Sequence, residues 1–260
     1  MGNGVVHFEF GAADDVPLVA FYRELFDWNL QSFPGGGYTM IDTCGGTGIN
    51  GGIGKSQTGE PWSAFYVEAD DPQELLDKAI SMGATTVLPV TDFGGAVTIA
   101  MFNDPDGLLI GIVQAPADAS EGSQPAPSAG SGEAVTWFEI LGPDAARTHQ
   151  FYSELFGWTI DDMAFPGYAT AKTGTSRGIM GGVGGGVGSA WAIVYAAVTD
   201  LDQILDRVIK LGGSRAADQE VSALKLASRK ALYGSSDDIK MAVIRDPAGN
   251  LLGLFEKTSK

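Results

Sequence analysis

The most constraining feature of the chain is an internal repeat whose period is as long as a whole domain. The segment FYRELFDW at residues 21–28 returns as FYSELFGW at residues 151–158, 130 positions later. The segment NDPDGLLIG at 103–111 returns as RDPAGNLLG at 245–253, 142 positions later. Because this period far exceeds the repeats of solenoid proteins, we expect two homologous globular domains. Any functional site must therefore be considered twice, and differences between the copies become informative.

The composition changes between the two copies and indicates a linker. Residues 116–133 show no apolar periodicity and are rich in Pro, Ala, Ser and Gly, which is typical of a flexible connector. In a chain of 260 residues, each half is long enough to bury a core of its own. We therefore expect an N-terminal domain at 1–115, a linker at 116–133 and a C-terminal domain at 134–260.

Each half predicts a β-α-β-β-β module that is written twice, which places the protein in the α+β class. In the first module, residues 5–10 read as a strand, and the apolar positions of 18–25 recur with the spacing of an amphipathic helix. Short strand-like runs separated by glycines follow, and the pattern restarts near residue 62. The second half repeats this plan with about 13 extra residues around 221–236. That insertion is either a loop with a role as a lid or interface, or a decoration.

Composition excludes several classes of function. The net charge of −16 argues against a nucleic-acid partner, which requires a basic face. No stretch approaches the roughly 18 apolar residues of a membrane span, and no signal-peptide pattern is present. The one cysteine, Cys44, excludes an intramolecular disulfide and a cysteine-rich metal site. We expect a cytoplasmic monomer or homodimer whose partner is a small molecule, with no nucleic-acid or membrane partner.

Several motifs together resemble the vicinal oxygen chelate superfamily, which includes glyoxalase I, bleomycin-resistance proteins and extradiol dioxygenases. They are the first-strand pattern, the helix ending in Phe-Tyr-x-x-Leu-Phe-x-Trp, and Asp-Pro-x-Gly ahead of a final apolar strand. The tandem form looks most like two-domain, glyoxalase-like actinobacterial proteins described as hydroxylases or 27-kDa antigens. The resemblance covers both halves, and it implies that two modules pair their sheets into an open, U-shaped barrel around one cavity.

The resemblance also implies where a metal site would lie. Metal-dependent members use a His on the first strand, a His opening the fifth strand and a Glu on the last strand. His7 matches the first position, but Pro61-Trp62-Ser63 and Gly111 stand at the other two. The second half has Trp137, Ala190-Trp191 and Gly253 at these places. One ligand of three cannot hold a catalytic metal, so we expect no metal and no other cofactor. Further along the last strands, Gln114 and Glu256 should face the opposite side.

The residues at the former ligand positions predict an aromatic binding site. Trp62, Trp137 and Trp191 stand where polar ligands would, and Tyr66 and Tyr195 follow on the same strand faces as Trp62 and Trp191. Gly111 and Gly253 are expected to open room opposite them. Such a cavity suits a flat, hydrophobic small molecule. The alternative is that these aromatic side chains simply pack the core.

Three residues are candidates for acid/base catalysis. Strand alternation puts Glu9 on the same face as His7, and Glu139 on the same face as Trp137. A carboxylate in an apolar cavity has a raised pKa and can act as a general base, and His7 could relay a proton. The alternative is a structural carboxylate bonded to backbone or to an Arg.

Two functions remain open. One is metal-independent binding of an aromatic secondary metabolite or antibiotic, in a binding, resistance or carrier role. The other is a metal-free acid/base enzyme, such as an isomerase, a cyclase or a hydroxylase-assisting protein. A metal-dependent lyase or dioxygenase is disfavoured by the missing ligands.

Overall fold

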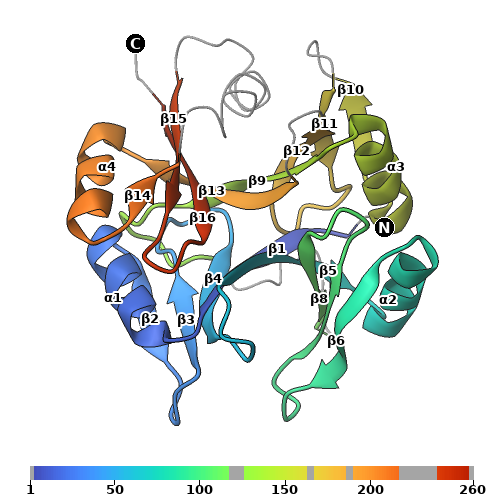
Figure 1. Cartoon of the computed structure of the whole chain (residues 1–260), viewed down its shortest axis with the longest axis horizontal. Coiled ribbons are helices and arrows are strands. Elements are labelled where there is room, and N and C mark those ends of the chain that lie inside the picture. The colour runs from blue at the N-terminus through green and yellow to red at the C-terminus, as the bar shows by residue number, and fades with distance from the viewer. Residues whose placement is uncertain (1–2, 117–125, 163–166, 186–189, 217–238, 258–260) are drawn as a thin grey trace. The chain divides into compact units, whose positions relative to one another are not determined.

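The computed structural model describes residues 3–116, 126–162, 167–185, 190–216 and 239–257 (Figure 1). The predicted insertion around 221–236 lies outside these residues. Within the described ranges the chain forms the expected α+β fold, with β-α-β-β-β modules in the predicted order.

The four modules have the following bounds. Module 1 comprises β1 (Val5–Ala12), α1 (Asp15–Leu25), β2 (Asn29–Ser32), β3 (Tyr38–Asp42) and β4 (Asn50–Lys55). Module 2 comprises β5 (Trp62–Ala69), α2 (Pro72–Ser81), β6 (Thr85–Asp92), β7 (Thr98–Asn103) and β8 (Leu109–Gln114). Module 3 comprises β9 (Val135–Gly142), α3 (Ala145–Phe156), β10 (Thr159–Asp162), β11 (Tyr168–Lys172) and β12 (Met180–Gly185). Module 4 comprises β13 (Trp191–Val198), α4 (Leu201–Lys210), β14 (Ser214–Arg215), β15 (Ile239–Arg245) and β16 (Leu251–Lys257).

Capping and amphipathicity explain the helices. An aspartate accepts hydrogen bonds from backbone N–H groups at each helix start, which satisfies donors that the helix itself cannot pair: Asp14, Asp71, Asp144 and Asp200. In α1 the predicted apolar stripe at positions 18, 21, 22 and 25 is buried, and Val19 is buried beside it. The local sequence therefore determines where the helices start and which face they bury.

The sheets follow the two halves of the sequence. The first half forms an eight-stranded sheet of order β2-β3-β4-β1-β5-β8-β7-β6, and the second half forms β10-β11-β12-β9-β13-β16-β15-β14. In each sheet the fifth strand of a half pairs in parallel with its last strand. This register places Tyr66 opposite Gly111 and Tyr195 opposite Gly253.

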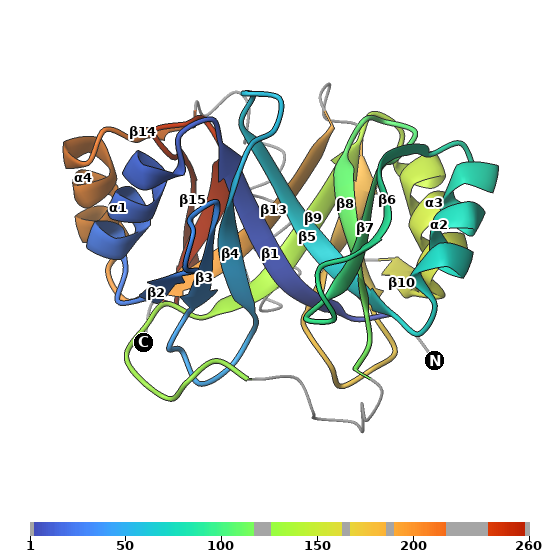
Figure 2. The ribbon, with the colours of Figure 1, turned by 90° about the horizontal axis from the view of Figure 1, so that it is seen from below.

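The compact cores, in contrast, draw on both halves of the sequence. Unit 1 consists of Met1–His7, Ala64–Pro125 and Phe138–Ala192, and unit 2 of Phe8–Ser63, Ala126–Trp137 and Ile193–Lys260. Accordingly, α1 lies beside α4 in unit 2 and α2 lies beside α3 in unit 1 (Figures 1 and 2). The division of the chain into two domains at 1–115 and 134–260 stays a prediction.

The repeated sequence motifs hold these units together. The tyrosine of the helix motif donates to the aspartate of the Asp-Pro-x-Gly motif from the other half of the chain. Tyr152 donates to Asp104 over 2.7 Å in unit 1, and Tyr22 donates to Asp246 over 3.1 Å in unit 2. The same aspartates accept from backbone N–H groups of their own turns. The motifs therefore link modules that are distant in sequence.

The second part of the segment between the copies packs against module 1. Ser128 bonds to Asp42 through its backbone N–H and its hydroxyl, and the indole of Trp28 donates to the carbonyl of Glu133 over 2.9 Å. An isolated β-bridge joins Ile49 to Val135 directly afterwards. Residues 126–133 are thus attached to module 1 by the hydrogen bonds of Ser128 and Glu133.

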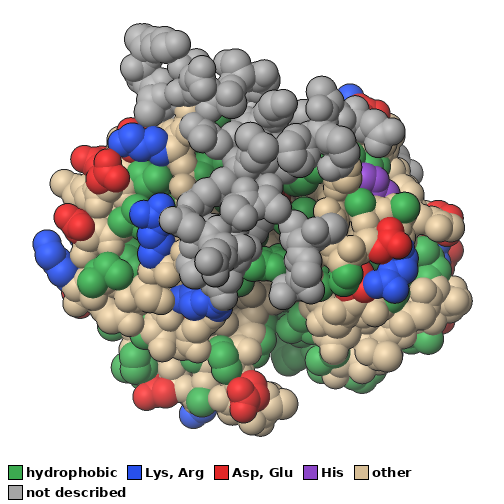
Figure 3. All heavy atoms as spheres, turned by 45° about the horizontal axis from the view of Figure 1, so that its top comes forward, with side chains coloured by type: hydrophobic (Ala, Val, Ile, Leu, Met, Phe, Trp, Pro, Cys, Tyr) green, Lys and Arg blue, Asp and Glu red, His purple; other side chains and the backbone are tan. Residues whose placement is uncertain are grey.

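The described surface is mixed in charge on the face shown in Figure 3, where Lys and Arg side chains lie among Asp and Glu side chains. Among the described residues, no helix has the length and apolar character needed to cross a membrane.

Candidate functional site

A glutamate and a tyrosine form a short hydrogen bond in each half of the chain. Tyr38 on β3 donates to Glu9 on β1 over 2.5 Å, and Tyr168 on β11 donates to Glu139 on β9 over 2.6 Å. Both carboxylates are buried, and Glu139 is completely inaccessible to solvent. The two pairs are related by the repeat of 130 positions, so the fold builds the same polar pair twice.

Glycines on the neighbouring strands make room for these tyrosines. A Cβ atom placed on Gly52 of β4 would collide with the hydroxyl of Tyr38. A Cβ atom on Gly182 of β12 would collide with the hydroxyl of Tyr168 in the same way. These glycines therefore allow a close approach that any side chain would block.

The environment of Tyr38 keeps its phenol protonated. Burial raises the pKa of Tyr38 far above its ordinary value of 10.0, and the charge of Glu9 and the hydrogen bond to it raise the pKa further. The phenol therefore acts as a donor at every working pH, and it orients the Glu9 carboxylate. In both halves a tyrosine supplies a hydrogen bond to the carboxylate, which is a partner that the sequence analysis did not name.

The two glycines at the last-strand position do not open room, contrary to expectation. A Cβ atom on Gly111 would collide with the ring of Tyr66, and a Cβ atom on Gly253 would collide with the ring of Tyr195. The parallel registers place each tyrosine directly opposite its glycine, so the rings fill the space. In unit 1, His7 packs against Tyr66 edge to face, with ring centroids 5.7 Å apart.

The predicted tryptophans, Trp62, Trp137 and Trp191, are buried or half-buried. This burial does not decide between a role in lining a binding site and simple packing in the core. In unit 2 the indole of Trp62 lies over Gly11 and Gly54, where added Cβ atoms would meet it. Trp191 and Trp137 are 7% and 5% exposed. Among the described residues, the indole Nε1 of Trp137 is the one buried side-chain nitrogen or oxygen that lacks a hydrogen-bond partner.

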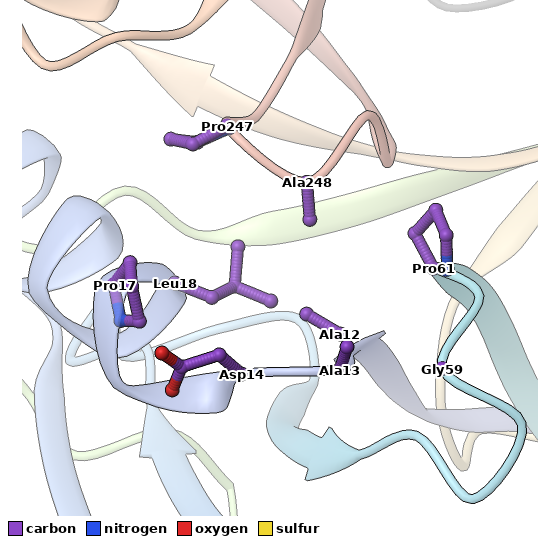
Figure 4. Close-up of a pocket in the computed structure, with 9 residues that line it drawn as sticks. All are labelled: Ala12, Ala13, Asp14, Pro17, Leu18, Gly59, Pro61, Pro247 and Ala248. Carbon is purple, nitrogen blue, oxygen red and sulfur yellow. The ribbon is translucent and has the colours of Figure 1, made fainter.

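A separate pocket of about 250 Å³ lies in unit 2 at the start of α1 (Figure 4). The ionisable group in its lining is Asp14, whose side chain already accepts from the N–H of Val16. The remaining lining is apolar or glycine: Ala12, Ala13, Pro17, Leu18, Gly59, Pro61, Pro247 and Ala248. At the equivalent repeat positions in unit 1, Arg147 and Asp106 form an ion pair instead. The pocket contains none of the predicted site residues.

Comparisons with known proteins show what the chain is similar to. A family profile described as "Bleomycin resistance protein-like N-terminal" matches residues 134–174. "Putative glyoxylase CFP32" of Mycobacterium tuberculosis is 28% identical over 212 residues, which are 76% of this chain and 78% of that protein. "Anthracycline biosynthesis protein DnrV" of Streptomyces peucetius is 28% identical over 234 residues, which are 80% and 81% of the two chains.

Two solved structures share the fold. The Mn(II)-bound glyoxalase from Novosphingobium aromaticivorans has a TM-score of 0.65 at 11% identity, over 99% of this chain and 83% of that one. Homoprotocatechuate 2,3-dioxygenase from Brevibacterium fuscum has a TM-score of 0.59 at 14% identity, over 99% and 82%. By the profile match, the named relatives and these folds, the chain is similar to the vicinal oxygen chelate superfamily in its tandem form.

The described residues do not fit the metal-ligand set of this superfamily. In the first half, Gly111 offers no donor, and the ring of Tyr66 occupies the space that a carboxylate would need. In the second half, Trp137 replaces the first histidine, and an indole N–H is a donor that cannot coordinate a cation. Within the described ranges, no group of three or more His, Cys, Asp or Glu side chains could hold a metal ion.

The two alternative donors further along the last strands also lie away from the site. Glu256 accepts from the N–H of Leu201 at the start of α4 over 2.8 Å, which places it on the helix side of the sheet as expected. Gln114 is exposed at the end of β8.

The two tyrosines of the Glu–Tyr pairs were missed by reasoning from the sequence. Tyr38 and Tyr168 are 130 positions apart, and each follows a glycine, so the repeat itself contained the signal. Their bonds to Glu9 and Glu139 depend on two further strands of the sheet, which local periodicity does not reveal.

Proposed function

We propose that the protein binds or processes an aromatic or otherwise hydrophobic small molecule without a bound metal. The observation that carries this proposal is the replacement of the last-strand carboxylate by a glycine covered by a tyrosine ring, in both halves. Each half thus has a buried aromatic ring, Tyr66 or Tyr195, where a metal-dependent relative has a ligand. Aromatic walls with a few polar groups are typical of sites for flat organic ligands.

The relatives support a ligand from secondary metabolism. DnrV of Streptomyces peucetius and DauV of a Streptomyces species are both named as anthracycline biosynthesis proteins. Anthracyclines contain fused aromatic rings, which agrees with the aromatic character of the predicted site residues. We therefore propose a role in making or handling a polycyclic aromatic metabolite.

The Glu–Tyr pairs favour a second candidate, a metal-free acid/base enzyme. A general base must be oriented toward the proton that it removes, and the phenols of Tyr38 and Tyr168 orient the carboxylates of Glu9 and Glu139. In this reading the carboxylate accepts a proton from the substrate and returns it at another atom, as in an isomerisation or a cyclisation. In each pair the tyrosine positions the base, and the raised pKa of Tyr38 keeps its phenol protonated.

Calorimetric titration tests the proposal without knowledge of the natural ligand. The chelator-treated, full-length protein is titrated with anthraquinone-2-sulfonate, a soluble tricyclic aromatic probe. We expect saturable binding that is unchanged when Mn(II) is added, because no step depends on the metal. Binding that appears only after Mn(II) is supplied would return the protein to the metal-dependent class.

A further inference from the structure

The indole N–H of Trp137 in unit 2 is a buried donor without a hydrogen-bond partner among the described residues. The side chain is 5% exposed. The indoles of Trp28 and Trp158 instead donate to backbone carbonyls, over 2.9 Å to Glu133 and 2.6 Å to Asn3. Because nearly all buried donors in proteins are paired, an unpaired one requires an explanation.

The position of Trp137 in the fold points to a ligand. Trp137 lies on β9 at the place that His7 occupies on β1, by the repeat of 130 positions. The strand next to β9 is β13, which carries Tyr195, and the strand after that is β16, which carries Gly253. In the first half, the equivalent His7 and Tyr66 are in ring contact. By this equivalence we expect Trp137 to lie beside Tyr195, a buried ring that packs over Gly253.

We infer that the N–H of Trp137 donates a hydrogen bond to an oxygen atom of the bound aromatic molecule. An indole is a donor only, so its partner must be an acceptor, and a cationic group is excluded. The ligand class is therefore an aryl ketone, a quinone or a phenolate, whose flat ring offers such an oxygen at its edge. This inference rests on the proposed aromatic-binding function and adds the chemical group that the site recognises.

The two halves should consequently differ in what they accept. His7 has a ring nitrogen that can donate or accept, whereas Trp137 can only donate. The site with Trp137 should discriminate against a ligand that lacks the acceptor oxygen, because that ligand would leave the buried N–H unpaired.

Paired probes with and without the acceptor test the inference. Full-length wild-type protein and the Trp137→Phe variant are titrated by calorimetry with anthraquinone-2-sulfonate and with anthracene-2-sulfonate, which has the same rings and charge but no quinone oxygens. We expect the wild type to prefer the quinone. The variant should bind the quinone about tenfold more weakly, and its affinity for the anthracene should be unchanged.

Thermal unfolding without ligand provides an independent readout. Trp137→Phe should lower the Tm less than Trp158→Phe, because both remove buried ring atoms but Trp137→Phe breaks no hydrogen bond. Trp158→Phe is the matched control: it deletes the same atoms, but it also breaks the bond to Asn3 and should lower the Tm.

The outcomes separate this inference from the function on which it rests. If Trp137→Phe lowers the Tm as much as Trp158→Phe, the N–H has a protein partner and the inference is wrong. If both proteins bind the quinone equally, the aromatic-binding function stands and the role of Trp137 fails. If the wild type binds neither probe, the aromatic-binding proposal fails and the inference fails with it.

Discussion

At the scale of single residues, the hydrogen bond from Tyr168 to Glu139 is the interaction of the candidate site whose loss should cost the most stability. Taking a carboxylate out of water is unfavourable unless hydrogen bonds replace the lost hydration. Tyr168 supplies such a bond over 2.6 Å to a carboxylate with no exposed surface. The counterpart carboxylate of Glu9 is 8% exposed, so water can compensate more easily for the loss of the bond from Tyr38.

Removal of the phenol should therefore destabilise the protein, more in the second half than in the first. We expect Tyr168→Phe to lower the free energy of unfolding by about 1–3 kcal/mol, because it leaves a buried carboxylate with one bond fewer. Tyr38→Phe should cost less. Urea denaturation of the two variants measures the difference. Equal stability of Tyr168→Phe and wild type would show that this bond contributes nothing.

Strand alternation was sufficient to select Glu9 and Glu139 as candidates, since period-two patterns report which face a residue occupies. It could not show that Gly111 and Gly253 lie under tyrosine rings. That result depends on the parallel register between the fifth and last strands of each half, and register is a property of the sheet, not of either strand alone.

At the scale of elements, basic side chains of one module donate hydrogen bonds to backbone carbonyls near the C-terminus of a helix in another module. Lys78 of α2 donates to the carbonyls of Glu154 and Leu155 at the end of α3, over 2.6 Å and 3.0 Å. Arg207 of α4 donates to the carbonyl of Glu24 in α1 in the same way. A cation at a helix C-terminus satisfies unpaired carbonyls and stabilises the helix dipole.

The buried turn aspartates predict a pH dependence of stability. Burial is the largest influence on Asp104 and Asp246, and it raises the pKa of both above 3.8 in spite of their hydrogen bonds. A folded-state pKa above the unfolded value means that the native state binds the proton more tightly. The stabilisation is therefore complete at low pH and is lost as the pH rises through the raised pKa.

Replacement of Asp104 tests whether the free energy of unfolding falls as the pH rises. Asp104→Asn cannot ionise, so its free energy of unfolding should fall less steeply than that of the wild type as the pH rises from 3.8. Urea denaturation at a series of pH values gives both slopes. A wild-type slope that is equal or shallower would contradict the raised pKa of Asp104.

The order of the elements was predictable because helix and strand periods and aspartate caps are local in sequence. The anchoring of residues 126–133 was not, since it depends on partners such as Asp42, which lies 86 positions before Ser128. A Pro-, Ser- and Gly-rich composition predicts a linker, but it does not report hydrogen bonds to distant residues.

At the scale of the whole molecule, the repeat and the compact units divide the chain differently. Each sheet comes from one half of the sequence, whereas each unit combines modules from both halves. In unit 1 a buried ion pair between Arg177 and Glu68, with a bond of 2.6 Å from Nε, joins segments from the two halves. A buried carboxylate or guanidinium left without its partner is strongly destabilising.

Separated halves should therefore be unstable alone. We expect fragments 1–115 and 134–260, expressed singly, to lack cooperative unfolding, because each loses the partner helix and the Tyr–Asp bonds of both units. Co-expression should restore a folded complex. Circular dichroism during heating measures this directly, and a sharp, independent transition of either fragment would support two self-sufficient domains.

We propose that the site works without a metal ion, and elemental analysis of the purified protein tests this proposal. Full-length protein is purified without chelator, dialysed, and analysed for Mn, Fe, Ni and Zn by mass spectrometry. Because glycines covered by tyrosine rings replace the last-strand ligand in both halves, we expect well under one equivalent of metal per chain. A stoichiometric metal that survives dialysis would contradict it.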